Sequence, residues 1–198
     1  MDYHLPNPTV DLNSLDRVPR IIVEEKADNP RELLDLWIIG YRSTNVEQKI
    51  ILDTIRSAIS SQRGGLFFID GPGGTGKTFV ENLLLNWVHG NSQIALAVAS
   101  SGIASILLLN GRTSHSTFHI PIDIQPESVC AISAQSALAE LLCCTTLIIW
   151  DEVSAQHRHC FEAIDHTLKD LRKNDIWFGG ISVVFAGEKN TTIQLTSR

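Results

Sequence analysis

The sequence lacks three features that would each suggest a class of protein. It contains no basic block longer than the pair Arg172–Lys173, and its net charge is −6. Any contact with nucleic acid must therefore come from a local groove rather than from a basic surface. No Cys-x-x-Cys pair occurs, which disfavours a zinc ribbon or a thioredoxin-like motif. No apolar stretch approaches the roughly 20 residues of a membrane-spanning helix, and the first residues predict no signal peptide. We therefore expect no membrane partner.

Cysteine is scarce as well. The chain has Cys130, the neighbours Cys143 and Cys144, and Cys160. Adjacent side chains point to opposite sides of most backbones, which suits buried thiols better than a bridge between Cys143 and Cys144. We expect all four thiols to be reduced, as in an intracellular compartment.

Composition and proline distribution predict one domain preceded by an arm. The 198 residues are 43% hydrophobic and 19% charged, as in ordinary globular proteins. More than half of the 7 prolines fall within residues 1–40, between short mixed segments. We interpret residues 1–43 as an irregular N-terminal arm with a little helix, and residues 44–198 as the folded domain.

Regular hydrophobic patterns begin at Thr44. Thr44 and Glu47 fit a capping box, in which Thr44 is the N-cap and Glu47 reaches back to it. Apolar residues at helical spacing then predict a helix that ends near Ser61.

Short apolar runs typical of strands buried on both faces follow. They lie at residues 66–69, 94–99, 147–150 and 181–186. We expect helices between them: one over about 77–88, one ending near Gly111, and one after residue 150. The inner face of the last helix is marked by Phe161, Ile164, Leu168 and Leu171. This alternation predicts an α/β domain, a parallel sheet with helices on both faces.

A glycine-rich turn connects the first predicted strand to the next helix. Residues 71–78, Gly71-Pro72-Gly73-Gly74-Thr75-Gly76-Lys77-Thr78, satisfy G-x-x-x-x-G-K-[ST]. Glycines let the backbone N–H groups point inward and form an anion nest at a helix N-terminus. Lys77 can then bridge the β- and γ-phosphates of a nucleotide, and the Thr78 hydroxyl can bind Mg²⁺. An accidental match is disfavoured by the strand and helix on either side, so we predict nucleotide binding.

Two acids follow the third predicted strand. Asp151 and Glu152 come directly after the apolar run 147–150, and ligands bind at the carboxyl edge of a parallel sheet. Asp151 can hold Mg²⁺, and Glu152 can orient or deprotonate an attacking water. Adjacent acids are also common at helix starts, but downstream of a phosphate loop we favour the catalytic interpretation for Lys77, Asp151 and Glu152.

At these motifs the sequence resembles the Pif-type (petite integration frequency) DNA helicases of superfamily 1, especially copies related to Helitron transposons. The likeness runs from about residue 44 to 187. It is carried by FFIDGPGGTGKTF (67–79), AVASSGIA (97–104), GRTSHSTF (111–118), LIIWDE (147–152), CFEAIDHTLKD (160–170) and FGG (178–180).

The resemblance implies further site residues. Gln48 would read the adenine of ATP, beside the phosphate loop 71–78. Ser100, Ser101, Gly102, Thr113 and His115 would line the path of single-stranded DNA, where hydroxyls and an imidazole suit contacts to phosphate and sugar. Trp150 is expected in the core rather than as a stacking platform.

The resemblance also implies an activity. The family has a RecA-like fold and hydrolyses ATP with Mg²⁺ to move 5′-to-3′ along single-stranded DNA. Its roles are DNA repair, recombination and telomere maintenance, usually in the nucleus.

The chain departs from the family after the fourth predicted strand. Where the family has Gly-Asp-Phe-Arg-Gln, residues 187–191 are Gly-Glu-Lys-Asn-Thr, so the glutamine that senses the γ-phosphate is absent. The family also closes its ATP site with arginines from a second RecA-like domain, for which 198 residues leave no room. We expect a monomeric first half that binds ATP and Mg²⁺ but does not unwind duplex DNA.

Two alternatives stand beside this interpretation. One is an inert transposon-derived remnant that at most binds nucleotide. The other is a P-loop kinase for small molecules, which the Asp151–Glu152 pair disfavours because a hydrolase, unlike a kinase, needs a group that activates water.

Overall fold

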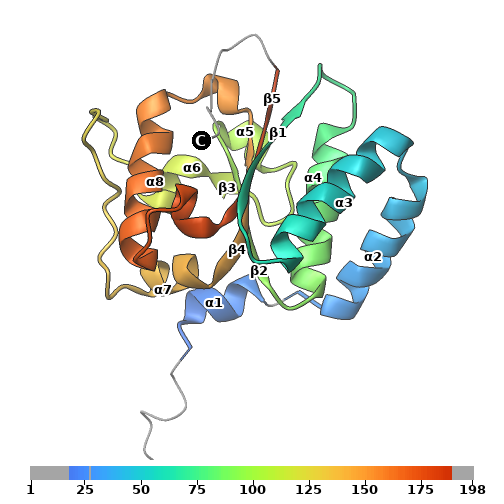
Figure 1. Ribbon diagram of the computed structural model, residues 1–198, viewed down its shortest axis with the longest axis horizontal. Helices are drawn as coiled ribbons and strands as arrows, with labels where there is room; N and C mark the ends of the chain where they lie inside the picture. The colour runs from blue at the N-terminus through green and yellow to red at the C-terminus, as the bar shows by residue number, and fades with distance from the viewer. Residues whose placement is uncertain (1–17, 27, 189–198) are drawn as a thin grey trace, which may run out of the picture.

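The fold is a single parallel sheet between two layers of helices (Figure 1). The computed structural model describes residues 18–26 and 28–188 of the chain. The five strands lie in the order β1-β5-β4-β2-β3, and each neighbouring pair is parallel. Their bounds are β1 Gly65–Asp70, β2 Ile94–Ala99, β3 Arg112–Thr113, β4 Thr145–Asp151 and β5 Ser182–Gly187. The predicted α/β class and the parallel sheet are confirmed.

One face of the sheet is covered by α2, α3 and α4, and the other by α1, α6, α7 and α8 (Figure 1). The helices are α1 Arg20–Glu25, α2 Pro30–Ser43, α3 Val46–Ser60, α4 Lys77–Gly90, α5 Gly102–Ser105, α6 Ser114–Phe118, α7 Ala137–Cys144 and α8 Arg158–Arg172. Two short 3₁₀ turns, η2 Val153–Ala155 and η3 Trp177–Gly180, precede α8 and β5. None of the described helices is both long and apolar enough to cross a bilayer.

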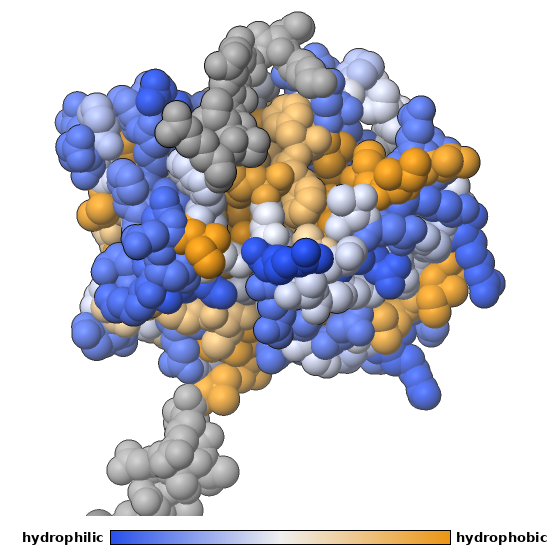
Figure 2. Space-filling view, viewed as in Figure 1, coloured by the Kyte–Doolittle hydropathy of each residue, from blue (hydrophilic) through white to orange (hydrophobic). Residues whose placement is uncertain are grey.

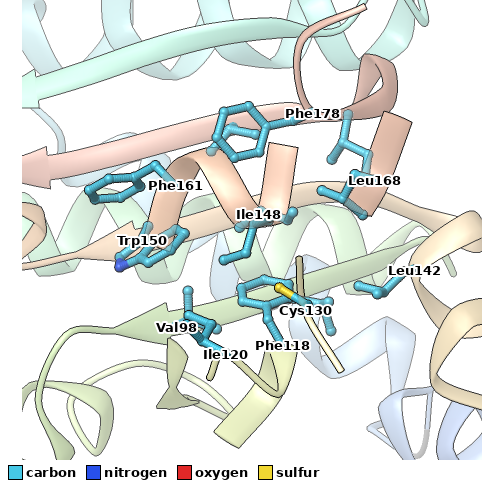
Figure 3. Close-up of a cluster of buried hydrophobic side chains, with 14 of the residues drawn as sticks. Val98, Phe118, Ile120, Cys130, Leu142, Ile148, Trp150, Phe161, Leu168 and Phe178 are labelled. Atoms are coloured by element: carbon cyan, nitrogen blue, oxygen red, sulfur yellow. The ribbon is translucent and has the colours of Figure 1, made fainter. Parts of the chain in front are cut away.

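The face that carries α8 holds a large aromatic core. Trp150 is fully buried, as expected, and its ring lies 4.5 Å from that of Phe161 and 5.9 Å from that of Phe118 (Figure 3). The predicted inner face of α8 is also confirmed, since Phe161, Ile164 and Leu168 belong to this core. Because β4 lies in the middle of the sheet and is buried along its length, its carboxyl end is held firmly in place.

The first predicted strand, β1, differs from expectation because it lies at the edge of the sheet. Among the described strands it pairs only with β5, and Phe68 is 41% exposed. The apolar run 66–69 therefore does not belong to a strand buried on both faces. Figure 2 shows hydrophobic residues on this side of the molecule near β1 and α3, whose exposed apolar side chains include Val46 and Ile50.

The capping box of α3 lies one residue later than predicted. Asn45 is the N-cap: its side chain accepts from the Gln48 backbone N–H at 2.8 Å, and the Gln48 side chain accepts from the Asn45 backbone N–H at 3.2 Å. The Thr44 hydroxyl instead donates to the carbonyl of Tyr41, at the end of α2. The shift arises because α2 continues to Ser43, which leaves Thr44 as its C-cap.

The described part of the predicted arm is more regular than its prolines suggested. Pro30 opens the 14-residue helix α2, with Asn29 as its N-cap, because proline fits the first helical position. The helix packs against α4 so closely that a Cβ on Gly40 would clash with Leu83. The Arg56 guanidinium lies over Trp37 and Trp87, 4.8 and 4.9 Å from the two rings. The boundary at residue 44 stays a prediction, and residues 1–17 lie outside the described part.

Two further expectations were wrong. The helix expected up to about Gly111 is only α5, because the Asn82 side chain hydrogen-bonds to the Leu107 carbonyl and the Leu109 N–H and holds that run in turns. Cys143 and Cys144, expected to be buried, are exposed at the end of α7. All four cysteines are free thiols.

Candidate nucleotide-binding site

The phosphate loop spans the gap between the end of β1 and the start of α4. Gly74 and Gly76 have φ angles of 80° and 87°, a region that side chains with a Cβ rarely adopt. Gly76 is the N-cap of α4 and no side chain caps this end of the helix. The first N–H groups of α4 therefore stay available to an anion, which the positive end of the helix dipole favours.

The side chains of the loop bind to its own backbone. The Lys77 ammonium donates to the carbonyls of Gly71 and Pro72, and the Thr75 hydroxyl donates to the Pro72 carbonyl at 2.9 Å. The Lys77 side chain is therefore folded back over the loop that is predicted to bind the phosphates.

Gln48 reaches the loop from the neighbouring helix α3. Its side-chain amide lies 3.5 Å from the Thr75 carbonyl, and a Cβ on Gly76 would come within 2.9 Å of the same nitrogen. A side chain at position 76 would therefore be disfavoured twice, by the positive φ angle and by its contact with the Gln48 side chain. The structure brings the predicted adenine-reading residue to the phosphate loop, and its contact with adenine stays a prediction.

The acidic pair lies at the carboxyl end of the central strand β4. Asp151 is 7% exposed, and one of its oxygens accepts from the Glu152 N–H at 2.8 Å. Burial raises the pKa of the Asp151 carboxyl, an effect opposed by that hydrogen bond and by the charge of Lys77. Glu152 has a φ of 53°, an unusual backbone for a residue with a side chain and one found at functional sites.

The residues expected to contact DNA gather at the same edge. Ser100 follows β2 and donates its N–H to the Asp151 carbonyl, and the Ser101 hydroxyl donates to the Glu152 carboxylate at 2.8 Å. Gly102 opens α5, where a Cβ would meet open space. The structure therefore joins the predicted DNA path directly to a predicted catalytic acid.

Thr113 and His115 lie further along this edge, on β3 and α6. Thr113 pairs with Ala99 of β2 and caps α6, its hydroxyl accepting from the Ser116 N–H at 3.4 Å. Its side chain therefore has a structural role in addition to the predicted one. His115 is exposed, and its contact with DNA stays a prediction.

The oxygens at this edge suit Mg²⁺. The Thr78 hydroxyl is on the first turn of α4, beside Lys77, and Lys77 is close enough to Asp151 to affect its pKa. A hydroxyl, a carboxylate and the phosphates of a nucleotide are the hard oxygen ligands that Mg²⁺ prefers. Thr78 and Asp151 would hold the ion, as the sequence predicts.

Sequence reasoning missed two acids that lie near these residues. Glu188, just after β5, accepts the Gly73 N–H at 3.1 Å through its Oε1. Glu81 is on α4 and is completely buried. In the sequence, Glu81 could have been noticed as an acidic residue within an apolar stretch of the predicted helix, four residues after Lys77. Glu188 had only the changed run at 187–191, of which residues 189–191 lie outside the described part.

Comparison with known proteins assigns the family. The sequence profile described as PIF1-like helicase matches residues 43–196. The ATP-dependent DNA helicase Pif1 of Psychrobacter sp. (strain PRwf-1) is 31% identical over 145 residues, which are 72% of this chain and 21% of that protein. The chain spans about a fifth to a quarter of the length of such curated relatives, with shares of 21%, 19% and 24% for three of them.

Solved structures give the same result. The unliganded Pif1 from Bacteroides sp. superposes with a TM-score of 0.58 at 29% identity, covering 73% of this chain and 32% of that one. Bacteroides Pif1 in complex with ADP-AlF3 and single-stranded DNA gives 0.57 at 28% identity, with coverage of 69% and 31%. With a five-stranded parallel sheet, a phosphate loop and an acidic pair at one edge, the chain belongs to the PIF1-like helicase family.

Proposed function

We propose that this chain is the ATP-binding part of an ATP-dependent DNA helicase that moves 5′-to-3′ along single-stranded DNA. The observation that carries the proposal is the meeting of three features at one sheet edge. These are the uncapped start of α4, the Lys77 ammonium, and the acidic pair Asp151–Glu152.

Each residue has a defined part in ATP hydrolysis. The amides of residues 73–78 and the Lys77 ammonium would bind the phosphates, and Gln48 would orient the adenine beside them. Thr78 and Asp151 would hold Mg²⁺, which when bound neutralises the charge that develops on the phosphates. Glu152 would accept a proton from the attacking water, because it is the exposed acid of the pair.

The contact between Ser101 and Glu152 supports coupling between DNA and hydrolysis. Because the Ser101 hydroxyl donates to the Glu152 carboxylate, a strand bound along Ser100–Gly102, with Thr113 and His115, would shift that contact. A shift would change the position of the catalytic base and hence the rate of hydrolysis.

The proposal extends to the setting of the activity. Repair, recombination and telomere maintenance in the nucleus are the proposed roles, and the chain is proposed to be a monomer. Unwinding is not expected of these 198 residues alone, since the two RecA-like domains of such a helicase must move against each other.

Nucleotide titration and ATP turnover test the proposal. The unmodified chain should bind a fluorescent ATP analogue with Mg²⁺ saturably, and its ATP turnover should rise when single-stranded DNA is added. Lys77→Ala should lose both, with affinity reduced at least about 100-fold if the ammonium supplies some 3 kcal/mol. Binding without turnover at any DNA concentration would support the inert remnant, and no saturable binding would refute the proposal.

A further inference from the structure

Glu81 is a buried acid without a partner. It lies in the middle of α4 with an exposed fraction of 0%, and neither of its carboxylate oxygens has a hydrogen-bond partner. Among the carboxylates of the described residues, it is the one for which both oxygens are buried and unpaired in this way. A buried carboxyl in this state destabilises the fold if it is charged.

The position of Glu81 points to the nucleotide site. Residues three and four apart share a helix face, so Glu81 is on the same side of α4 as Thr78 and Lys77. The charges that act on it belong to Asp151 and Lys77. Glu81 therefore lies close enough to Lys77 and Asp151 for their charges to act on it, on the helix face that also carries Thr78.

The packing around Glu81 gives no structural reason for an acid. Leu84 and Leu85, three and four residues further along the same face of α4, are fully buried and apolar and belong to the core on this side of the sheet. A leucine would fill this position without loss of a hydrogen bond or an ion pair. An acid that costs stability and satisfies no group of the fold suggests a ligand from outside the chain.

That ligand must be a cation that arrives with the nucleotide. Glu81 and Asp151 would repel each other if both carboxyls were ionised, and a divalent cation nearby would stabilise both as carboxylates. The described residues contain no group of three or more His, Cys, Asp or Glu side chains that could bind a metal by themselves. Further oxygens are therefore needed, and nucleotide phosphates supply them at this place.

We propose that Glu81 is a positioning residue for nucleotide-bound Mg²⁺, acting behind Asp151 and Thr78 in the outer shell of the ion. The inference rests on the proposed function, since it requires that this site binds a nucleotide with Mg²⁺. It adds a residue that the phosphate-loop motif and the acidic pair do not include.

The measured quantity is the enhancement of nucleotide binding by Mg²⁺. The Kd of a fluorescent ADP analogue is determined with and without Mg²⁺, and the ratio is compared between the unmodified chain and Glu81→Gln, which keeps the shape but removes the charge. We expect the ratio to fall about tenfold, as for other outer-shell partners of metals, while the Kd without Mg²⁺ is unchanged. Electron paramagnetic resonance of Mn²⁺ with ADP should show a matching loss of metal affinity.

Three comparisons make the result specific. Asp151→Asn should also lower the ratio, and Glu140→Gln, an exposed acid on α7 across the sheet, should not. Glu81→Leu replaces Glu81→Gln if the latter does not fold. Thermal denaturation should show Glu81→Gln to be at least as stable as the unmodified chain, which a structural role for the acid would not allow.

The outcomes separate the inference from the proposed function. If the unmodified chain shows Mg²⁺-enhanced binding that Glu81→Gln leaves within twofold, the inference is refuted and the proposed function stands. If the unmodified chain takes up no nucleotide, both are refuted.

Discussion

The same strands contribute different kinds of buried side chain to the two faces of the sheet. On the α8 face the strands contribute large side chains such as Trp150, whose ring packs against that of Phe161 (Figure 3). Phe185 of β5 packs against the same two rings. On the α4 face they contribute Ala95, Ala97 and Ala186 among their buried residues. Small strand residues leave the space between sheet and helix to side chains of α3 and α4. The α8 face thus holds an aromatic core, whereas the α4 face packs the sheet against the helix that follows the phosphate loop.

The buried acids show the same contrast. Asp165 on α8 is 3% exposed, and its two oxygens accept from the Phe178 N–H and from the Lys169 ammonium, both at 2.7 Å. Glu81 on α4 is equally buried and has no partner. Burial alone therefore does not show whether an acid stabilises the fold. The hydrogen bonds that the acid accepts are the better guide.

The largest expected effect comes from removing the paired acid. Asp165→Ala leaves the buried Phe178 N–H without an acceptor and Lys169 without its counter-ion, so the free energy of unfolding should fall by about 3 kcal/mol. Urea denaturation measures the change. Asp170 on the same helix pairs with Lys173, and both side chains are 76% exposed. Asp170→Ala should therefore lower the free energy of unfolding by less than about 0.5 kcal/mol. Equal losses in the free energy of unfolding for Asp165→Ala and Asp170→Ala would contradict the role assigned to the hydrogen bonds of Asp165.

A smaller effect is expected from the pH dependence of stability. Burial, with a contribution from Asp151, raises the pKa of the Glu81 carboxyl to about 8, whereas Lys77 lowers it. Between pH 4.5, the ordinary pKa of a glutamate, and about pH 8, the folded chain binds a proton that the unfolded chain has lost. Stability should therefore fall as pH rises through this window, by about 2 kcal/mol from pH 6 to 8.

The Glu81→Gln variant isolates that contribution, because it lacks the titrating group. Its free energy of unfolding, from urea denaturation at both pH values, should change less than that of the unmodified chain. His89, whose pKa is lowered by burial, contributes equally to both proteins. If the free energy of unfolding depends on pH in the same way in both proteins, the folded chain does not hold this extra proton on Glu81.

The smallest effect concerns the acid that occupies the phosphate loop. Glu188 accepts the Gly73 N–H, so its carboxylate competes with an incoming phosphate. Glu188→Gln should tighten nucleotide binding about two- to fivefold, as expected from a surface charge contribution of some 0.5–1 kcal/mol. The gain in nucleotide affinity should be smaller at high salt, which screens surface charges. Glu127→Gln, which changes an exposed acid distant in sequence from the phosphate loop, should leave the affinity unchanged. Weaker binding in Glu188→Gln would contradict this role.

Much of the site was predictable because its signals are local. The glycines and Lys77 of the loop follow a fixed spacing, and Asp151–Glu152 follow a strand whose burial is evident from its apolar run. Parallel strands then place all their carboxyl ends at one edge, which brings Ser101 beside Glu152. The capping residue of α3 was missed by one position because the neighbouring helix α2 decided it.

The sequence alone therefore determined the phosphate loop, the parallel α/β arrangement and the acids at the end of the central strand, since each depends on a few residues in a row. Only the tertiary structure decided which strand lies at the sheet edge, that the predicted arm contributes the helix α2, that Glu81 is buried without a hydrogen-bond partner, and that Glu188 contacts the phosphate loop. The physical reason is that burial and pairing depend on residues far apart in the chain: an acid in an apolar stripe looks the same in sequence whether it finds a partner, as Asp165 does, or none, as Glu81 does.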